Sequence, residues 1–300
     1  MLMATLRWGA LMGGPEHPLY AGLVNPVDSD AVTLPSVSSA LTDETVWDAL
    51  AHRSVQTNET SRAVVWRLPA ALISAIQPNA RFSLFDVGAS AGLNLVGDRL
   101  NAPWTDQDGC PVIQNRETID IVQRTGFDKA PLDVNLEEDM QWLYACVWPG
   151  LSKRLERLSR AITAFRKSSR TERMNVLRCN ASEAPSQMNG LGDVSLAYQS
   201  LLHDYLPAAE KKMYEAGMHA WLRLRPGRNW WIELEISKNA PSPETAALIR
   251  ARCFDGETLC THDLARCHPH PDRLVLNRDQ LHSFSDTVRR TLGDTPNGGI

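Results

Sequence analysis

Several features that would assign this chain to a class at once are missing from it. The 300 residues contain no C-x-x-C pair, no run of 18 apolar residues and no excess of basic side chains. Six scattered cysteines are typical of reduced thiols and argue against a disulfide framework or a zinc knuckle. The missing apolar run argues against a membrane span. A net charge of −4 provides no basic surface, so neither a nucleic acid nor a membrane is the expected partner.

Motifs for phosphate binding are missing as well. The glycine-rich stretch near residue 90 lacks the third glycine of G-x-G-x-x-G and the Gly-Lys-Ser/Thr of a P-loop. A secretory signal is only faintly suggested, because Arg7 interrupts the first apolar run and no small-residue cleavage site follows it. We therefore expect a cytoplasmic protein without a pyrophosphate-type cofactor site.

The patterns that are present alternate between helix and strand. Residues 42–51 and 60–76 have the apolar spacing of helices. Beyond them, short apolar runs separated by helical stretches predict a doubly wound α/β domain with a mostly parallel sheet. We expect a partly irregular start over residues 1–40. The chain is expected to divide into a helical N-terminal segment or lid over 1–80, the α/β domain over 81–290 and a tail over 291–300. Within the α/β domain, strands are expected at 82–87, 119–127, 174–177, 194–198 and 230–236.

The C-terminal part predicts one exception to parallel pairing. A helix is expected over residues 244–253, followed by strands near 258–262 and 273–277. A proline-containing connection joins the last two strands, so they are expected to pair as a hairpin. The sheet would then contain one antiparallel strand.

The stretch FSLFDVGASAGLNL, residues 82–95, is the strongest candidate for a ligand site. A strand that ends in G-x-x-x-G and turns into a helix brings backbone N–H groups and a helix N-terminus together. Gly88 and Gly92 let the backbone approach a ligand, and the small residues between them leave the approach open. S-adenosylmethionine, which has no pyrophosphate, suits this turn better than a dinucleotide. The alternative is a turn that only packs a helix against a strand.

Polar residues after the next two strands fit the rest of such a cofactor. Asp128 follows the second strand, where a carboxylate can accept hydrogen bonds from both ribose hydroxyls. The insert 101–117 accounts for its long separation from the glycine turn. Asn180 follows the third strand, where its amide could bind an adenine edge. Each has a structural alternative, a cap for Asp128 and an ordinary turn residue for Asn180.

Four segments resemble an uncharacterised bacterial group, domain-of-unknown-function family 2332. The likeness covers residues 45–280 and includes the QTNE and GASAGLNL motifs. The resemblance implies the fold of S-adenosylmethionine-dependent methyltransferases. In chain order the segments are VQTNETSRA (55–63), DVGASAGLNL (86–95), GFDKAPLD (126–133) and VWPGLSKRLERL (147–158).

The resemblance also implies a seven-stranded sheet whose last strand is antiparallel. It implies a site for S-adenosylmethionine, with S-adenosylhomocysteine as the product. Asn180 stands where members of this fold commonly have an aspartate, so its contact is the least typical. The expected cofactor-binding residues are Asp86, Gly88, Ser90, Gly92, Asn94, Asp128 and Asn180.

Candidate catalytic residues lie on either side of the cofactor turn. Tyr198 and His203 follow the fourth strand, and His203 is a candidate base because the ordinary pKa of histidine lies near neutrality. A structural histidine is the alternative. Gln56, Asn58 and Glu59 precede the α/β domain and could form a lid, with Glu59 orienting the acceptor, or could only cap a helix.

Three further groups have weaker patterns. Glu233 and Glu235 share one face of the fifth strand and are candidate acid–base groups. His268 and His270 lack the i, i+4 spacing of a zinc motif, so no metal is expected there. The basic stripe within residues 154–160 is expected to be a solvated helix face.

These patterns predict a methyltransferase that acts on a small-molecule acceptor. One alternative is a noncatalytic binding or scaffold protein descended from the same fold. Another is a nicotinamide-dependent oxidoreductase, against which the missing third glycine counts. The acceptor and the oligomeric state do not follow from the sequence.

Overall fold

The computed structural model describes residues 1–24, 29–101, 104–113, 119–169 and 174–293. The chain forms two compact units that interleave along the sequence. One comprises Met1–Glu59 with Leu132–Arg166, and the other comprises Thr60–Pro131 with Lys167–Ile300. These bounds differ from a linear division at residue 80, because residues 132–166 return to the N-terminal helices while residues 60–80 belong with the sheet.

The first unit is largely helical, including most of the described residues before 40, which were expected to be partly irregular. Trp8 and Trp142 meet edge to face with ring centroids 6.3 Å apart, and the Arg53 guanidinium lies over both rings. The expected helix near residue 42 begins at Glu44 and is capped by Asp43, whose carboxylate accepts the backbone N–H of Thr45 at 2.9 Å. The elements are α1 (Leu2–Gly13), η1 (Gly14–Glu16), α2 (Tyr20–Leu23), η2 (Ser29–Ala31), α3 (Leu34–Ala40), α4 (Glu44–His52), α6 (Glu137–Ala145) and α7 (Ser152–Ser168).

The second unit contains an eight-stranded sheet, in the order β3-β2-β1-β4-β5-β6-β7-β8 among the described residues. The first five strands pair in parallel and the last three pair antiparallel. The prediction of an α/β fold with a mostly parallel sheet is confirmed, but seven strands with one antiparallel was wrong. The strands are β1 (Arg81–Val87), β2 (Asp120–Asp128), β3 (Met174–Arg178), β4 (Val194–Ser200), β5 (Asn229–Ile236), β6 (Ala247–Phe254), β7 (Leu259–Cys267) and β8 (Leu274–Leu276).

The expected helix over 244–253 was wrong, because strand β6 occupies most of that range. Its residues alternate strictly between buried and half-buried from Ala247 to Phe254, which is the period of two of a strand. The hairpin expected from the last two strands is confirmed by the antiparallel pairing of β7 with β8. β6 adds a second antiparallel neighbour on the other side of β7.

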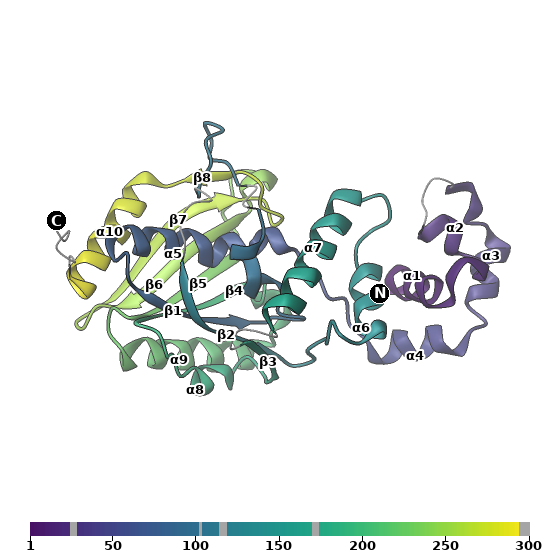
Figure 1. Cartoon of the computed structure of the whole chain (residues 1–300), viewed down its shortest axis with the longest axis horizontal. Helices are drawn as coiled ribbons and strands as arrows, with labels where there is room; N and C mark the ends of the chain where they lie inside the picture. Colours follow the sequence, from purple (N-terminus) through teal and green to yellow (C-terminus); the bar gives the residue numbers. More distant parts are fainter. Residues whose placement is uncertain (25–28, 102–103, 114–118, 170–173, 294–300) are drawn as a thin grey trace. The chain divides into compact units, whose positions relative to one another are not determined.

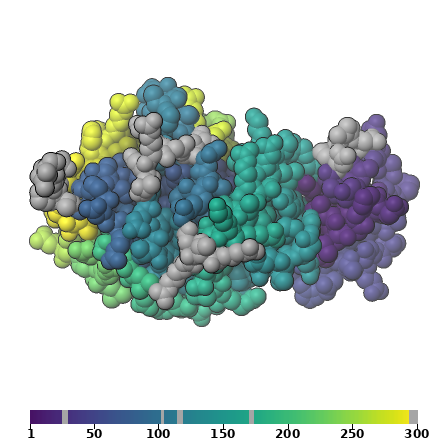
Figure 2. All heavy atoms as spheres, in the orientation of Figure 1, coloured from purple at the N-terminus to yellow at the C-terminus, as the bar shows by residue number. Residues whose placement is uncertain are grey.

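Helices cover both faces of this sheet, as Figure 1 shows. On one face Phe85 packs edge to face on Trp221 of α9, and on the other Tyr198 contacts Trp66 of α5. In the space-filling view the yellow C-terminal residues lie beside the blue residues near position 70, in keeping with the contacts between residues 278–292 and 64–76 (Figure 2). The remaining elements are η3 (Thr60–Ala63), α5 (Val64–Ile76), η4 (Leu93–Arg99), α8 (Ala184–Gln187), η5 (His203–Tyr205), α9 (Ala208–Leu224), η6 (Pro243–Thr245) and α10 (Arg278–Leu292).

Candidate functional site

The strand order places the candidate site at the carboxyl ends of β1, β2 and β4. β1 lies between β2 and β4, and the chain continues to β2 and β3 on one side and to β4 and β5 on the other. In an open parallel sheet this reversal leaves a crevice beyond the carboxyl ends of the strands, where ligands bind. The residues that follow β1, β2 and β4 are therefore the ones to compare with the predictions.

The glycine turn after β1 has a left-handed backbone at three positions. Gly88, Ser90 and Gly92 have φ values of 80°, 53° and 73°, a region that only glycine enters without strain. The backbone N–H groups of Gly88 and Ala89 donate to the carbonyl oxygen of Phe127 at 2.8 and 3.1 Å. The turn leads into the seven-residue 3-10 helix η4, with a kink at Val96, instead of the expected regular helix.

Asp128, at the end of β2, ties the glycine turn to its own strand. Its Oδ2 accepts the backbone N–H of Ser90 at 2.7 Å, and its Oδ1 accepts that of Ala130 at 2.8 Å. Each carboxylate oxygen has a second lone pair that these bonds do not use. The carboxylate is therefore fixed beside the turn and can still accept hydroxyl groups.

Asp86 is the last polar side chain of β1, and it is buried at 3% exposure. Burial raises its pKa to about 8, the Tyr198 hydroxyl beside it acts against that rise, and the charge of Asp128 adds to it. Asp86 Oδ2 and the Tyr198 hydroxyl are enclosed and have no well-aligned hydrogen bond among the described residues, although the hydroxyl lies close enough to Asp86 to act on its pKa. Burial and Asp86 together hold the pKa of Tyr198 well above its usual range. A buried pair left unsatisfied in this way is costly, and a ligand could complete it.

The other two expected cofactor residues differ in exposure. Asn94 lies on η4, where its side-chain Oδ1 is enclosed without a partner among the described residues and its backbone oxygen accepts Trp66 Nε1 at 2.9 Å. Asn180 is exposed just after β3. It lies beside the end of β2, because the N–H of Cys179 donates to the backbone oxygen of Asp128 at 2.9 Å.

A second polar group lies on the α9 face of the sheet, at the ends of β4 and β5. Gln199 is fully buried, donates to Glu235 at 2.6 Å and accepts from Tyr214 at 2.6 Å and from Trp231 at 3.1 Å. Glu235 also accepts the backbone N–H of Leu202 at 3.0 Å. This network holds the start of the loop after β4.

Glu233 belongs to the same face and is 4% exposed. Burial raises its pKa to about 7, although the charge of Arg252 acts against the rise. Glu233 forms an ion pair with Arg252, whose guanidinium lies 4.7 Å above the Trp231 ring. Its Oε1 lies 3.7 Å from Nε2 of His203. The structure therefore brings His203 and Glu233 together. Sequence reasoning missed Arg252, since its place depends on the antiparallel register of β5 and β6.

Glu59 belongs to the other compact unit, together with Gln56 and Asn58. Its buried carboxylate pairs with Arg154 at 2.9 Å and with Arg157 at 3.1 Å. The basic stripe of α7 was expected to be a solvated face, but two of its arginines bind Glu59. Within its own unit, Glu59 is therefore an ion-pair centre.

This ion-pair centre makes a stability prediction. Glu59→Gln leaves Arg154 and Arg157 without their anion, so we expect a loss of about 1–3 kcal/mol in the free energy of unfolding. Chemical denaturation measures it. Glu156→Gln is the matched control, since its pair with Arg160 is exposed and worth about 0–1 kcal/mol. An equal, small loss in both variants would contradict a structural role for Glu59.

The histidines near the C-terminus have structural contacts. His262 is buried against Trp230 and Phe284, and Nδ1 of His268 accepts the backbone N–H of His270 at 3.1 Å. No group of three or more metal-binding side chains is found among the described residues.

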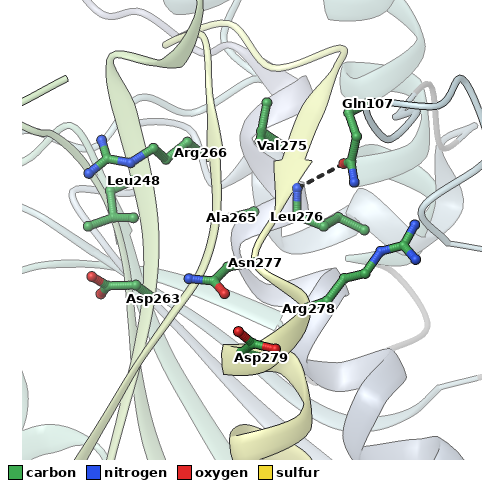
Figure 3. Close-up of a pocket in the computed structure, with 10 residues that line it drawn as sticks. All are labelled: Gln107, Leu248, Asp263, Ala265, Arg266, Val275, Leu276, Asn277, Arg278 and Asp279. Atoms are coloured by element: carbon green, nitrogen blue, oxygen red, sulfur yellow. Dashed lines mark hydrogen bonds between the residues drawn. The ribbon is translucent and has the colours of Figure 1, made fainter. Parts of the chain in front are cut away.

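An open hollow of about 500 Å³ lies on the antiparallel part of the sheet (Figure 3). Asp263 and Arg266 of β7, Val275 of β8 and Asp279 of α10 line it. None of its lining residues belongs to the glycine turn or to the ends of β2 and β4. It is therefore a separate feature of the surface.

One sequence motif at the glycine turn after β1 was also not recognised from the sequence. Residues 88–92, GASAG, have the G-x-S-x-G spacing of a serine nucleophile elbow, in which the serine stands on a strained turn after a strand. Ser90 has the positive φ of such a turn. However, the elbow presents its serine at the surface of the site, whereas Ser90 is 7% exposed.

The fold and the site define a mixed α/β protein with a polar, partly unsatisfied edge at the carboxyl ends of its parallel strands. The family model described as an uncharacterized protein conserved in bacteria, DUF2332, matches residues 2–275. The chain belongs to this family.

Comparisons with curated proteins and solved structures add little. No curated protein matches the chain. One similar solved structure is described as a protein-L-isoaspartate O-methyltransferase from Plasmodium falciparum in complex with S-adenosyl-L-homocysteine. It is 12% identical, covers 70% of each chain and has a TM-score of 0.29. No described helix is long and apolar enough to cross a membrane.

Proposed function

We propose that this protein binds S-adenosylmethionine at the carboxyl ends of β1 and β2 and transfers its methyl group to a small-molecule acceptor. The observation that carries the proposal is the enclosed, unpartnered Oδ2 of Asp86 beside the left-handed glycine turn. An ammonium group would give this carboxylate the cationic partner that it lacks. Asp128 would accept the ribose hydroxyls with its remaining lone pairs. The bound cofactor supplies an activated methyl group.

The same geometry counts against a nicotinamide cofactor. A dinucleotide needs free backbone N–H groups in the turn for its pyrophosphate. The N–H groups of Gly88 and Ala89 are already bound to Phe127. The short 3-10 helix η4 also gives less of a helix N-terminus than the expected regular helix.

Calorimetric titration tests the proposal. We expect saturable binding of S-adenosylmethionine and S-adenosylhomocysteine and none of NAD. Asp128→Ala removes a charged acceptor and loosens the turn, so affinity is expected to fall about 10- to 100-fold. Asp286→Ala is the control, because Asp286 is an exposed aspartate of α10. Absence of binding to the wild-type protein would refute the proposal and leave the scaffold alternative.

A serine hydrolase or acyltransferase is the second candidate, supported by the spacing of GASAG and the positive φ of Ser90. A nucleophilic serine reacts with a fluorophosphonate probe, which mass spectrometry would locate on Ser90. We expect no labelling, because Ser90 is buried. Labelling that is lost in Ser90→Ala would replace the methyltransferase proposal.

A further inference from the structure

We propose that His203 and Glu233 form an acid–base pair that takes a proton from the methyl acceptor at Nδ1 of His203. The acceptor is then a hydroxyl or amine compound and not a carboxylate. This inference rests on the proposed function, and it names the acceptor class and the base of that same site.

The loop that carries His203 is fixed next to the glycine turn. Glu235 accepts the backbone N–H groups of Leu202 and His203 at 3.0 and 3.3 Å. Leu201 has a strained φ of 53° and donates its N–H to the oxygen of Leu234 at 2.8 Å. The Leu202 side chain lies so close to Gly88 that a Cβ on that glycine would be 3.0 Å from it. The residue before His203 therefore contacts the turn that would hold the methyl donor.

The two ring nitrogens of His203 have different surroundings. Nε2 is enclosed, has no hydrogen-bond partner in the part of the chain that the structure describes, and lies 3.7 Å from Oε1 of Glu233. Nδ1 is not among the enclosed, unpartnered atoms, and the side chain as a whole is 15% exposed. A hydrogen on Nε2 facing the carboxylate leaves the lone pair on Nδ1, the atom that an acceptor can reach. Separations of this size commonly shorten when a site is occupied.

Charges on several elements act on this histidine. Glu233 of β5, Arg252 of β6, Lys211 of α9 and Asp204 of its own loop surround it. Burial, together with the charges of Lys211 and Arg252, lowers the pKa of His203 to about 4, and the charge of Asp204 acts against this shift. The imidazole is therefore neutral at neutral pH, which is the form that accepts a proton. The nearby Glu233 carboxylate would stabilise the imidazolium that results.

The step itself is a simple proton transfer. The O–H bond of a hydroxyl acceptor, or one N–H bond of a protonated amine, breaks; the proton goes to Nδ1 of His203, and the electron pair stays on oxygen or nitrogen as the nucleophile. His203 becomes imidazolium, with its Nε2–H toward Glu233. Glu233 acts only through His203, so it is a positioning residue.

The carboxyl groups at the ends of β2 and β5 select the class of acceptor. A carboxylate is already an anion at neutral pH and needs no base. It would also have to enter an edge that holds the carboxyl groups of Asp128 and Glu235, where like charges repel. A neutral hydroxyl or a protonated amine avoids that repulsion and uses the base.

Nitrogen-15 NMR of the histidine rings tests the pair in the full-length protein without any ligand, with His203→Gln for assignment. We expect the Nε2–H tautomer at neutral pH and protonation only well below the ordinary range. Glu233→Gln should mix the tautomers and lower the pKa of His203 further, whereas Arg252→Gln should raise it. Glu257→Gln, on the exposed β6–β7 turn, is the control and should change neither. An Nδ1–H tautomer, or a titration that Glu233→Gln leaves unchanged, would overturn the pair.

Methyl transfer tests the acceptor class. Phenols, alcohols and amines are compared with carboxylic acids, using S-adenosylmethionine as donor. His203→Gln should lower kcat for the first group about 100-fold or more while S-adenosylhomocysteine binds as before. Transfer to carboxylic acids that is insensitive to His203→Gln would overturn the inference and leave the proposed function standing. Failure to bind the donor would refute the proposed function and the acceptor class together, while NMR still decides on the pair.

Discussion

Asp86→Asn is expected to make the protein more stable at neutral pH. Burial raises the pKa of Asp86 from its ordinary value of 3.8 to about 8. Between these values the folded state keeps a proton that the unfolded state has released, so stability falls as pH rises through this window. The slope for one such group is at most about 1.4 kcal/mol per pH unit. Asparagine has no charge to desolvate, and this part of the pH dependence should disappear.

Urea unfolding from about pH 5 to about pH 8 measures this effect. The difference in unfolding free energy between Asp86→Asn and wild type should grow with pH and reach a few kcal/mol near the upper end. Asp286→Asn, on the exposed face of α10, should follow the wild-type curve. Parallel curves for Asp86→Asn and wild type would show that Asp86 is ionised in the folded protein.

The same variant should bind S-adenosylhomocysteine at least about 10-fold more weakly, because an amide cannot pair with an ammonium group as a carboxylate does. Higher stability with weaker binding is the pattern of a residue kept for function at a cost in folding. Tighter binding in Asp86→Asn would argue that this position does not face a cation.

The parallel half of the fold could be predicted from the sequence, and the antiparallel half only in part. The apolar runs before Gly88 and Asp128 are short and end in turn residues, so each run marks a strand directly. The range 247–254 follows a proline and contains good helix formers, which led to the wrong helix. Tertiary pairing with β5 and β7 overrides that propensity, and the alternating burial of β6 records it.

The residues of the candidate site also differ in how far the sequence predicts their neighbours. Asp86, Gly88 and Asp128 follow strands, and strand ends in a parallel sheet meet at one edge, so local patterns suffice to bring them together. The neighbours of Glu233 depend on register: Arg252 reaches it because it lies opposite Trp231 on an antiparallel strand. Nor could local spacing show that Glu59 pairs with arginines almost 100 residues later.

Arg124→Met is expected to have the largest effect on stability of any single change outside the hydrophobic core. Arg124 of β2 is 2% exposed at its side chain and binds Asp98 through two bonds of 2.7 and 2.8 Å. It also donates to the backbone oxygen of Leu95, so it fastens η4 to the sheet. Removing the arginine leaves the largely buried Asp98 carboxylate with only the half-exposed Arg99, 3.2 Å away, and leaves the Leu95 oxygen without its donor. Breaking such a pair costs about 3–5 kcal/mol.

A double-mutant cycle separates the pair from its surroundings. Arg124→Met combined with Asp98→Asn should cost less than the two single changes added together, since no buried charge then stays unpaired. Arg81→Met is the matched control: the Arg81–Asp193 pair also joins a strand to a loop, but it is about half exposed and worth about 0–1 kcal/mol.

Because η4 follows the glycine turn and carries Asn94, the Arg124 variant should also bind S-adenosylhomocysteine more weakly, whereas Arg81→Met should bind it normally. Equal losses of stability in Arg124→Met and Arg81→Met would mean that burial adds nothing to this pair. The anchoring of η4, and with it the shape of the turn, would then come from packing alone.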